Sequence, residues 1–388
     1  MITEAALYLA SPEDASRARS AVAGRPVAFR MLMAAIRAGC RRVYVPDIFR
    51  GSDVERAIAA AASARAATVW LDHDAKPPEG PILLLPAAAL VPPSALAALL
   101  AAPPLALLAA SRDSDAPVVA AGAALAAALW TSIAAGQPLG DALERALKGT
   151  EVTVIPGAGW YVRSVSPAAG KEAEVQIYAG LASAIDTWLD TVFHRRLSLP
   201  LSRAAVAGGL TPNQVTLASL LVGLGAVWCF WQATPARAIV GLLLYAAAVV
   251  LDHADGEVAR LTLTESPLGA WLDVAVDTAI HALLVVAMGM TAQQVGGDGA
   301  ALAGVVAAIG VVASATLTQT SPPARGGGIG LLLDALSNRD GFYAMLVIFI
   351  LGLALRPGAL PALMIFLAVG CHAFWLSRLA WRPFLRTK

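Results

Sequence analysis

The pattern of apolar and polar positions changes near residue 200. Beyond about residue 210, long runs rich in Leu, Val, Ile and Trp alternate with short polar connectors, and a helix needs about twenty mostly apolar residues to cross a bilayer. We predict six transmembrane helices, at residues 213–233, 237–252, 268–290, 299–319, 341–356 and 360–379. Residues 201–388 are therefore expected to form an α-helical integral membrane domain.

The first 170 residues follow a different pattern, in which short apolar segments alternate with helical ones. We predict strands at residues 6–10, 43–46, 69–71 and 82–86. The apolar stretches 83–110 and 118–135 are interrupted by prolines or consist mostly of alanine, which gains little from lipid, so both are expected to be buried core. Strands that alternate with helices indicate a soluble, Rossmann-like α/β domain over residues 1–170.

A stripe of apolar side chains lies between these two parts. Its members recur every three or four residues and lead into His194-Arg195-Arg196; they are Tyr178, Leu181, Ile185, Trp188, Leu189, Val192 and Phe193. This spacing predicts an amphipathic juxtamembrane helix over residues 171–200, suited to the inner membrane surface. The alternative is a helix that packs on the soluble domain.

Composition and charge agree with a membrane protein. The chain is 58% hydrophobic and only 14% charged, and a net charge of +1 argues against a nucleic-acid binder. Its three cysteines show no spacing typical of a metal site or disulfide framework. We predict no signal peptide, because the N-terminal segment has charged residues and no uninterrupted apolar core.

Basic residues predict the orientation in the membrane. The span ends on one side carry Arg195, Arg196, Arg203, Arg260, Arg325, Arg339, Arg378, Arg382, Arg386 and Lys388, and those on the other side carry Arg237 and Arg356. Because cytoplasmic ends are enriched in Arg and Lys, we expect a multi-pass protein of the inner membrane with both termini in the cytoplasm.

Four aspartates lie at the second and third predicted spans, where charge is costly and usually functional. Asp252 and Asp255 are three residues apart, and Asp273 and Asp277 are four apart, so each pair shares one helical face. If the two helices pack together, the four carboxylates converge and repel one another. All-oxygen ligation favours Mg²⁺, Mn²⁺ or Ca²⁺. The alternative is a salt-bridged helix hairpin.

These residues resemble the signature of the CDP-alcohol phosphotransferases. The signature reads Asp252-x-x-Asp255-Gly256-x-x-Ala259-Arg260, then eight residues, then Gly269-x-x-x-Asp273-x-x-x-Asp277. The segment 211–216, Thr-Pro-Asn-Gln-Val-Thr, is also similar to that family, and the resemblance covers roughly residues 185–385.

The resemblance implies an enzyme that transfers a phospho-alcohol group from a CDP-alcohol to an acceptor hydroxyl and releases CMP. Asp252, Asp255 and Asp273 would ligate one or two ions, Mg²⁺ or Mn²⁺, and Asp277 would complete the site and act as general base. The CDP pocket would be lined by Asn213, Gly256, Ala259, Arg260 and Gly269. The resemblance also implies a homodimer.

The sequence gives weaker indications of where the acceptor binds. Arg325 and Arg339 face the cytoplasmic side and could bind a phosphorylated acceptor, or they could anchor helix ends at lipid headgroups. Gly326-Gly327-Gly328 could form a mobile loop or a simple connector. His281 continues the helical face of Asp273 and Asp277, and we expect it to be a structural, hydrogen-bonded histidine.

The N-terminal half resembles the sugar-nucleotide and inositol-phosphate nucleotidyltransferases through residues 24–27, 31–45 and 159–161. Residues 9–13, Leu-Ala-Ser-Pro-Glu, stand where that family has a glycine-rich nucleotide loop, and residues 85–88 and 161–163 lack the aspartates expected for a metal. We therefore expect an inactive scaffolding or regulatory domain. Retained activity would require Asp72 or Asp74 as ligands.

The leading hypothesis is phospholipid synthesis, with CDP-diacylglycerol as donor and a polar alcohol or its phosphate as acceptor. A second hypothesis is synthesis of an inositol phosphodiester from CDP-inositol. A third, from a different class, is a non-catalytic membrane scaffold that binds nucleotide, although four clustered aspartates argue against it.

Overall fold

The computed structural model describes residues 2–72, 75–103, 106–108, 116–148, 151–155, 167–181, 187–320 and 338–385. The chain forms two compact units, one of residues 1–181 with 260–264 and the other of residues 182–259 with 265–388. This division separates an α/β unit from a helical unit.

The α/β unit is built on a seven-stranded sheet in the order β5-β4-β1-β6-β8-β7-β9. The strands are β1 (Glu4–Tyr8), β4 (Arg42–Pro46), β5 (Thr68–Leu71), β6 (Ile82–Pro86), β7 (Ala106–Leu108), β8 (Val118–Ala121) and β9 (Val154–Ile155). Strands β5, β4, β1 and β6 are parallel, and β8 is antiparallel to both neighbours. The parallel strands thus follow the chain order third, second, first, fourth that Rossmann folds use.

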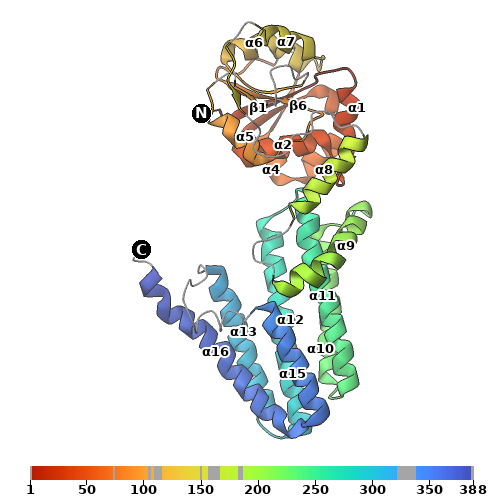
Figure 1. The fold of residues 1–388 in the computed structure, drawn as a ribbon, viewed down its shortest axis with the longest axis vertical. Coiled ribbons are helices and arrows are strands. Elements are labelled where there is room, and N and C mark those ends of the chain that lie inside the picture. The colour runs from red at the N-terminus through yellow and green to blue at the C-terminus, as the bar shows by residue number, and fades with distance from the viewer. Residues whose placement is uncertain are drawn as a thin grey trace. The chain divides into compact units, whose positions relative to one another are not determined.

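Helices cover both faces of this sheet (Figure 1). The helices of this unit are α1 (Asp14–Arg19), α2 (Val27–Ala38), α3 (Asp53–Ala60), α4 (Ala62–Ala67), α5 (Pro93–Leu100), α6 (Ala123–Ala134), α7 (Gly140–Leu147) and α8 (Pro167–Ala179), of which α8 packs beside a short hairpin of β2 (Ala21–Val22) and β3 (Arg25–Pro26). Along β1, Ala5 and Leu7 enter one core and Ala6 and Tyr8 enter the other, because successive side chains of a strand point to opposite faces.

The four predicted strands agree with β1, β4, β5 and β6 to within two residues, and an N-terminal α/β sheet domain is confirmed. All five residues of β6 are buried, as expected for a central strand covered on both faces. The two apolar stretches that we assigned to buried core supply β6, α5, β7, β8 and α6.

The second unit is a bundle of long helices (Figure 1). These are α10 (Pro212–Trp231), α11 (Pro235–Thr262), α12 (Pro267–Gly296), α13 (Ala300–Thr320), α15 (Arg339–Leu355) and α16 (Leu360–Leu385), with a short turn η3 (Pro357–Ala359) before the last. Each overlaps a predicted span. Among the described residues, five helices are long and apolar enough to cross a membrane. The 17-residue α15 is shorter, so the sixth span stays a prediction.

The predicted juxtamembrane helix over residues 171–200 is wrong as a single element. Helix α8 ends at Ala179, followed by a turn at Gly180 and Leu181, and glycine disfavours helix by about 1 kcal/mol relative to alanine. Residues 182–186 lie outside the described part. A new helix then runs through the π-helical turn η2 (Asp190–His194) into α9 (Arg195–Ala207).

The apolar stripe therefore divides between two elements. Leu181 is buried in the first unit, whereas the large apolar side chains of η2, α9 and the residues just before them are exposed: Trp188, Val192, Phe193, Leu197 and Leu201. An exposed apolar stripe beside Arg195 and Arg196 is the surface that an interfacial helix presents to a bilayer. The exposed part of the apolar stripe thus lies within residues 188–207, and its place at a membrane surface stays a prediction.

Candidate active site at the α11 and α12 helices

The four aspartates come from two neighbouring helices of the bundle. Asp252 and Asp255 lie on α11, and Asp273 and Asp277 lie on α12. Asp252 is within hydrogen-bonding reach of Asp273 and interacts electrostatically with Asp277, and Asp273 interacts with all three of the others. The carboxylates therefore converge, as their helical spacing predicts.

Capping residues determine where the helices α10 and α12 begin, next to this site. Thr211 caps α10 in a reciprocal capping box with Gln214, and Pro212 occupies the first turn, where its missing N–H is no loss. In the same way, Ser266 caps α12, and its hydroxyl accepts from Gly269 N at 3.0 Å. The segment that resembles the family at residues 211–216 is therefore a helix start.

Polar contacts from α10 fix the position of α11. Thr216 Oγ1 donates to Asp255 Oδ2 at 2.5 Å, and Ser219 Oγ donates to the Ala248 carbonyl at 2.9 Å. Asp255 is only 3% exposed. Its carboxylate is thus held by a buried hydroxyl, and the sequence alone did not predict this partner.

Arg339, the predicted acceptor-binding residue, lies at the aspartate cluster. Its Nη2 is 2.9 Å from Asp252 Oδ2 and 3.9 Å from Asp277 Oδ1, and its Nη1 is 3.4 Å from Asp190 Oδ1. One guanidinium cannot offset four clustered carboxylates, so the site retains the negative charge that a divalent cation would neutralise. The other predicted acceptor residue, Arg325, lies outside the described residues, as do Gly326-Gly327-Gly328.

A buried cluster of Asp190, His194 and His253 lies beside Arg339, and sequence reasoning missed it. Asp190 Oδ1 is 2.9 Å from His194 Nδ1 and 3.0 Å from His253 Nε2. Burial alone would raise the pKa of Asp190, but hydrogen bonds from both histidines and from Thr187 N, with the charge of Arg339, outweigh it and hold this pKa well below its ordinary value. The separation of Asp190 and His194 by one helical turn was the available signal.

This Asp/His cluster has the residue types that can hold a metal ion, but its donor atoms are already engaged. His194 Nε2 is 2.9 Å from the Tyr343 hydroxyl, His253 Nδ1 is 3.0 Å from the Val249 carbonyl, and Arg339 Nη1 lies within 3.3 Å of both His253 ring nitrogens. A guanidinium at that distance would repel a cation. The contacts therefore describe a hydrogen-bonded network.

Two of the residues expected to line a CDP pocket lie side by side. A Cβ atom at Gly269 would lie 3.2 Å from Ser266 Oγ and 3.6 Å from Asn213 Oδ1. A larger residue at position 269 would therefore crowd the space between the starts of α10 and α12. Gly256 and Ala259 lie further along α11, and Arg260 groups with the first unit.

The helical part of the chain matches the model of a known family. Residues 209–376 match the family model described as CDP-alcohol phosphatidyltransferase. The chain carries a CDP-alcohol phosphatidyltransferase domain. The match contains all four aspartates and Arg339, so the resemblance inferred from the sequence is confirmed.

Three relatives share sequence with the chain. Two are described as "Bifunctional IPC transferase and DIPP synthase", from Archaeoglobus fulgidus (28% identical over 134 residues, 34% of this chain and 26% of the relative) and from Thermococcus kodakarensis (28% over 139 residues, 36% and 31%). The third is "Archaetidylinositol phosphate synthase" from Aeropyrum pernix (36% over 90 residues, 20% and 45%). The chain thus matches about a quarter to a third of the length of the two bifunctional relatives.

Glu257, at a variable position of the signature, secures α9 to the phosphatidyltransferase domain. It is fully buried and accepts hydrogen bonds from Arg195 Nη1 at 2.7 Å, Ser198 Oγ at 2.7 Å and Ser202 Oγ at 2.6 Å. These contacts satisfy the carboxylate and leave it no evident part in the chemistry.

His281 has partners on both ring nitrogens. Nδ1 lies 2.7 Å from the Asp277 carbonyl and Nε2 lies 2.8 Å from the Tyr245 hydroxyl. Both contacts agree with the structural, hydrogen-bonded histidine that we expected.

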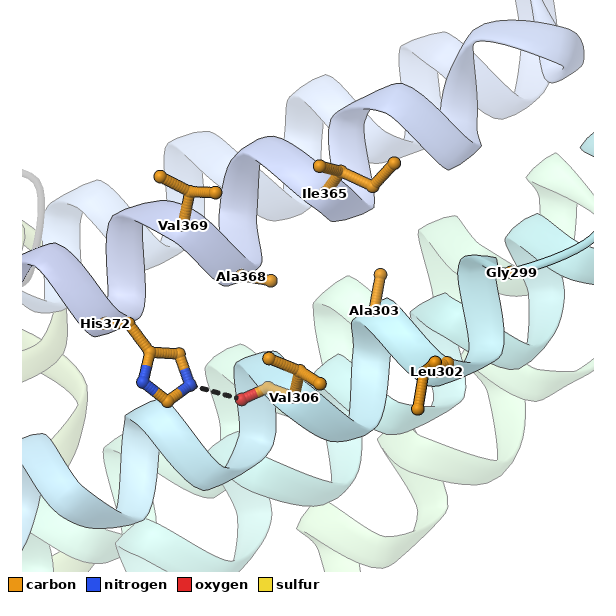
Figure 2. Close-up of a pocket in the computed structure, with 8 residues that line it drawn as sticks. All are labelled: Gly299, Leu302, Ala303, Val306, Ile365, Ala368, Val369 and His372. Carbon is orange, nitrogen blue, oxygen red and sulfur yellow. Dashed lines mark hydrogen bonds between the residues drawn. The ribbon is translucent and has the colours of Figure 1, made fainter.

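Two pockets among the described residues of the phosphatidyltransferase domain differ in character. A small one of about 10 Å³ is lined in part by Asp252, Asp277 and Tyr245. A larger, open groove of about 390 Å³ lies between α13 and α16, and its lining is apolar except for His372, which hydrogen-bonds the Val306 carbonyl (Figure 2). The larger groove therefore lacks the groups that phosphate transfer requires.

The α/β unit has a carboxylate where a Rossmann-like fold would place phosphates, after the first strand. Asp14 is 4% exposed and accepts from Ala10 N at 2.9 Å, Ser11 N at 3.2 Å and Ser11 Oγ at 2.9 Å. Ala87 and Ala88 follow β6 and are buried. Asp72 follows β5, and Asp74, residues 159–161 and Arg163 lie outside the described residues.

Proposed function

We propose that the chain transfers a phospho-alcohol group from a CDP-alcohol to the hydroxyl of a polar acceptor and releases CMP. The observation that carries this proposal is the convergence of Asp252, Asp255, Asp273 and Asp277 within a matched phosphatidyltransferase domain. A non-catalytic scaffold would have no need for four acidic groups in mutual repulsion.

The donor set fits a divalent cation. Four carboxylates supply hard oxygen ligands, and Arg339 leaves most of their charge unbalanced. We infer that Asp252, Asp255, Asp273 and Asp277 would hold one or two Mg²⁺ or Mn²⁺ ions. When bound, such ions offset negative charge on a diphosphate and its leaving group.

Asp277 is suited to the role of general base. Its side chain is 38% exposed, whereas that of Asp252 is 14% exposed, so an acceptor hydroxyl reaches Asp277 more easily. The acceptor oxygen forms a bond to the phosphorus that carries the donor alcohol, the bond from that phosphorus to the CMP oxygen breaks, and Asp277 takes the acceptor proton.

The donor is proposed to be a CDP-linked lipid such as CDP-diacylglycerol, with a phosphorylated polar alcohol as acceptor. Five membrane-capable helices and an arginine at the carboxylates support that pairing, as does the likeness to an archaetidylinositol phosphate synthase. A CDP-inositol donor is the second candidate, which the likeness to the two bifunctional enzymes favours. The two candidates differ in which substrate carries the lipid.

The α/β unit is proposed to be catalytically inactive. Asp14 already satisfies the amides of Ala10 and Ser11, which would otherwise be free to bind phosphate, and its negative charge would repel one. Ala87 and Ala88 supply no ligand, although metal-dependent nucleotidyl transfer needs carboxylates.

The test is CMP release by purified protein in detergent with Mg²⁺ or Mn²⁺. CDP-diacylglycerol and CDP-inositol are each paired with glycerol phosphate, inositol phosphate, inositol and serine. Release that depends on CDP-diacylglycerol and a phosphorylated acceptor supports the proposal, and release only from CDP-inositol supports the second candidate. If no pair releases CMP although CDP-alcohols still bind, the result contradicts the proposed reaction and supports the scaffold hypothesis.

A further inference from the structure

The first five residues of α15 contact residues 187–194 in three places. Arg339 Nη1 lies 3.4 Å from Asp190 Oδ1, Thr187 Oγ1 donates to Asp340 Oδ1 at 2.7 Å, and His194 Nε2 is 2.9 Å from the Tyr343 hydroxyl. Asp190 and His194 both belong to η2, a π-helical turn, and such turns are often found at functional sites. These contacts bring the start of α15 to one turn that precedes the bundle.

Asp190 is the charged member of that turn, and all of its partners hold it in place. The residue is 4% exposed, and it accepts from Thr187 N at 2.8 Å in addition to the contacts from His194, His253 and Arg339. A carboxylate with so many donors stays ionised and stationary. It therefore offers a fixed anion to the Arg339 guanidinium.

Arg339 bridges this fixed anion and the aspartate cluster. One nitrogen contacts Asp190 while the other contacts Asp252 at 2.9 Å and approaches Asp277 at 3.9 Å. Without Asp190, Nη1 would keep only its contacts with His253, whose ring is itself held by Asp190. The guanidinium could then rotate into the carboxylates and compete with a cation there. Two anions that contact different nitrogens of a planar fork fix its direction.

We propose that Asp190 is a positioning residue that holds the Arg339 guanidinium at the edge of the carboxylate cluster, where it binds the phosphate of a phosphorylated acceptor. The inference rests on the proposed function. Asp190 would act only through Arg339, so its loss should weaken acceptor binding and leave donor binding unchanged.

The experiment measures steady-state CMP release with CDP-diacylglycerol and inositol phosphate for the wild type, Asp190→Asn and Tyr343→Phe. In Asp190→Asn, KM for the acceptor should rise about tenfold, as expected for loss of one close charge contact, and KM for the donor should change less than about twofold. Tyr343→Phe is the matched control because it removes the His194–Tyr343 contact between the same two elements and keeps the Arg339–Asp190 contact. Its acceptor KM should stay within about twofold of wild type.

A double-mutant cycle separates positioning from general structural damage. In an Arg339→Ala background, Asp190→Asn should cause no further change in acceptor KM, because the group through which it acts is gone. Additive effects would overturn the proposal. An increase in the Mg²⁺ concentration needed for half-maximal activity of Asp190→Asn would also overturn it, because Asp190 would then support the metal directly.

Two further measurements distinguish failure of this proposal from misfolding and from failure of the proposed function. If Asp190→Asn does not fold, as judged by its elution and thermal unfolding, Arg339→Lys answers the same question, because an ammonium cannot bridge both anions. A wild-type acceptor KM in Arg339→Lys would contradict the proposal. Failure of the proposed function has a different signature, since the wild type itself would then release no CMP with any phosphorylated acceptor.

Discussion

Charge imbalance is the dominant property of the candidate active site at the scale of single residues. Asp273 interacts with each of the other three aspartates, and replacing it by Asn keeps its shape but removes one anionic ligand. We expect Asp273→Asn, and likewise Asp277→Asn, to lower CMP release at least about a hundredfold, since several kcal/mol of charge stabilisation correspond to that factor. The measurement is CMP release at saturating donor and Mg²⁺.

The control for this prediction is Asp298→Asn. Asp298 is an exposed aspartate in the connector between α12 and α13, so its replacement should leave the rate unchanged. All variants should elute and unfold as the wild type does. Retained turnover in both Asp273→Asn and Asp277→Asn would rule out the metal mechanism.

The residues that could be predicted from the sequence are those whose spacing is local. Asp252 and Asp255, or Asp273 and Asp277, share a helical face because of helix geometry alone. The partners Thr216 and Asp255 are 39 positions apart, Arg195 and Glu257 are 62 apart, and Asp190 and Arg339 are 149 apart. No local pattern encodes such pairings, so the network around Arg339 needed the tertiary structure.

At the scale of elements, the backbones of α12 and α13 come very close together at Gly289 and Gly304. A Cβ atom at Gly289 would lie 2.8 Å from both the Ala300 carbonyl and Gly304 Cα, and small residues allow such close approach in membranes. We expect Gly289→Ala to lower the free energy of unfolding by about 1–3 kcal/mol through overpacking. Thermal unfolding in one detergent measures the change.

Gly370→Ala is the matched control within the same bundle. Gly370 lies on α16, and a Cβ atom there would meet nothing within 4 Å. The substitution should be neutral or should raise stability by up to about 1 kcal/mol, because alanine is the better helix former. Equal unfolding temperatures for the two variants would show that the α12–α13 crossing has room to adjust.

Hydropathy predicted where the helices are and misplaced some of their ends. The second predicted span stops at residue 252, but α11 continues to Thr262, because polar residues can extend a helix beyond the apolar stretch that identifies it. The predicted juxtamembrane helix shows the opposite error, because the structure interrupts it. Its spacing continues across Gly180, where the chain leaves helix α8, and periodicity alone does not detect such a break.

The number of spans decides the topology of the whole molecule. Six spans place both termini in the cytoplasm, whereas a chain in which the 17-residue α15 fails to cross would place its C-terminus on the opposite side. We expect a green fluorescent protein fused after Lys388 to be fluorescent and an alkaline phosphatase at the same place to be inactive. A phosphatase fused after Asp298 should be active, and the reverse result at Lys388 would exclude six spans.

The chain combines an α/β unit with a phosphatidyltransferase domain, which raises the question of whether it makes its own donor. Asp14 satisfies the loop amides after β1, so we expect no pyrophosphate from CTP and inositol phosphate, while CMP release from a supplied CDP-alcohol proceeds. Pyrophosphate assays on the full chain with Mg²⁺ test this. Pyrophosphate formation that Asp72→Asn abolishes would show instead that the carboxylate after β5 supplies the missing ligand, and the unit would then be an active cytidylyltransferase.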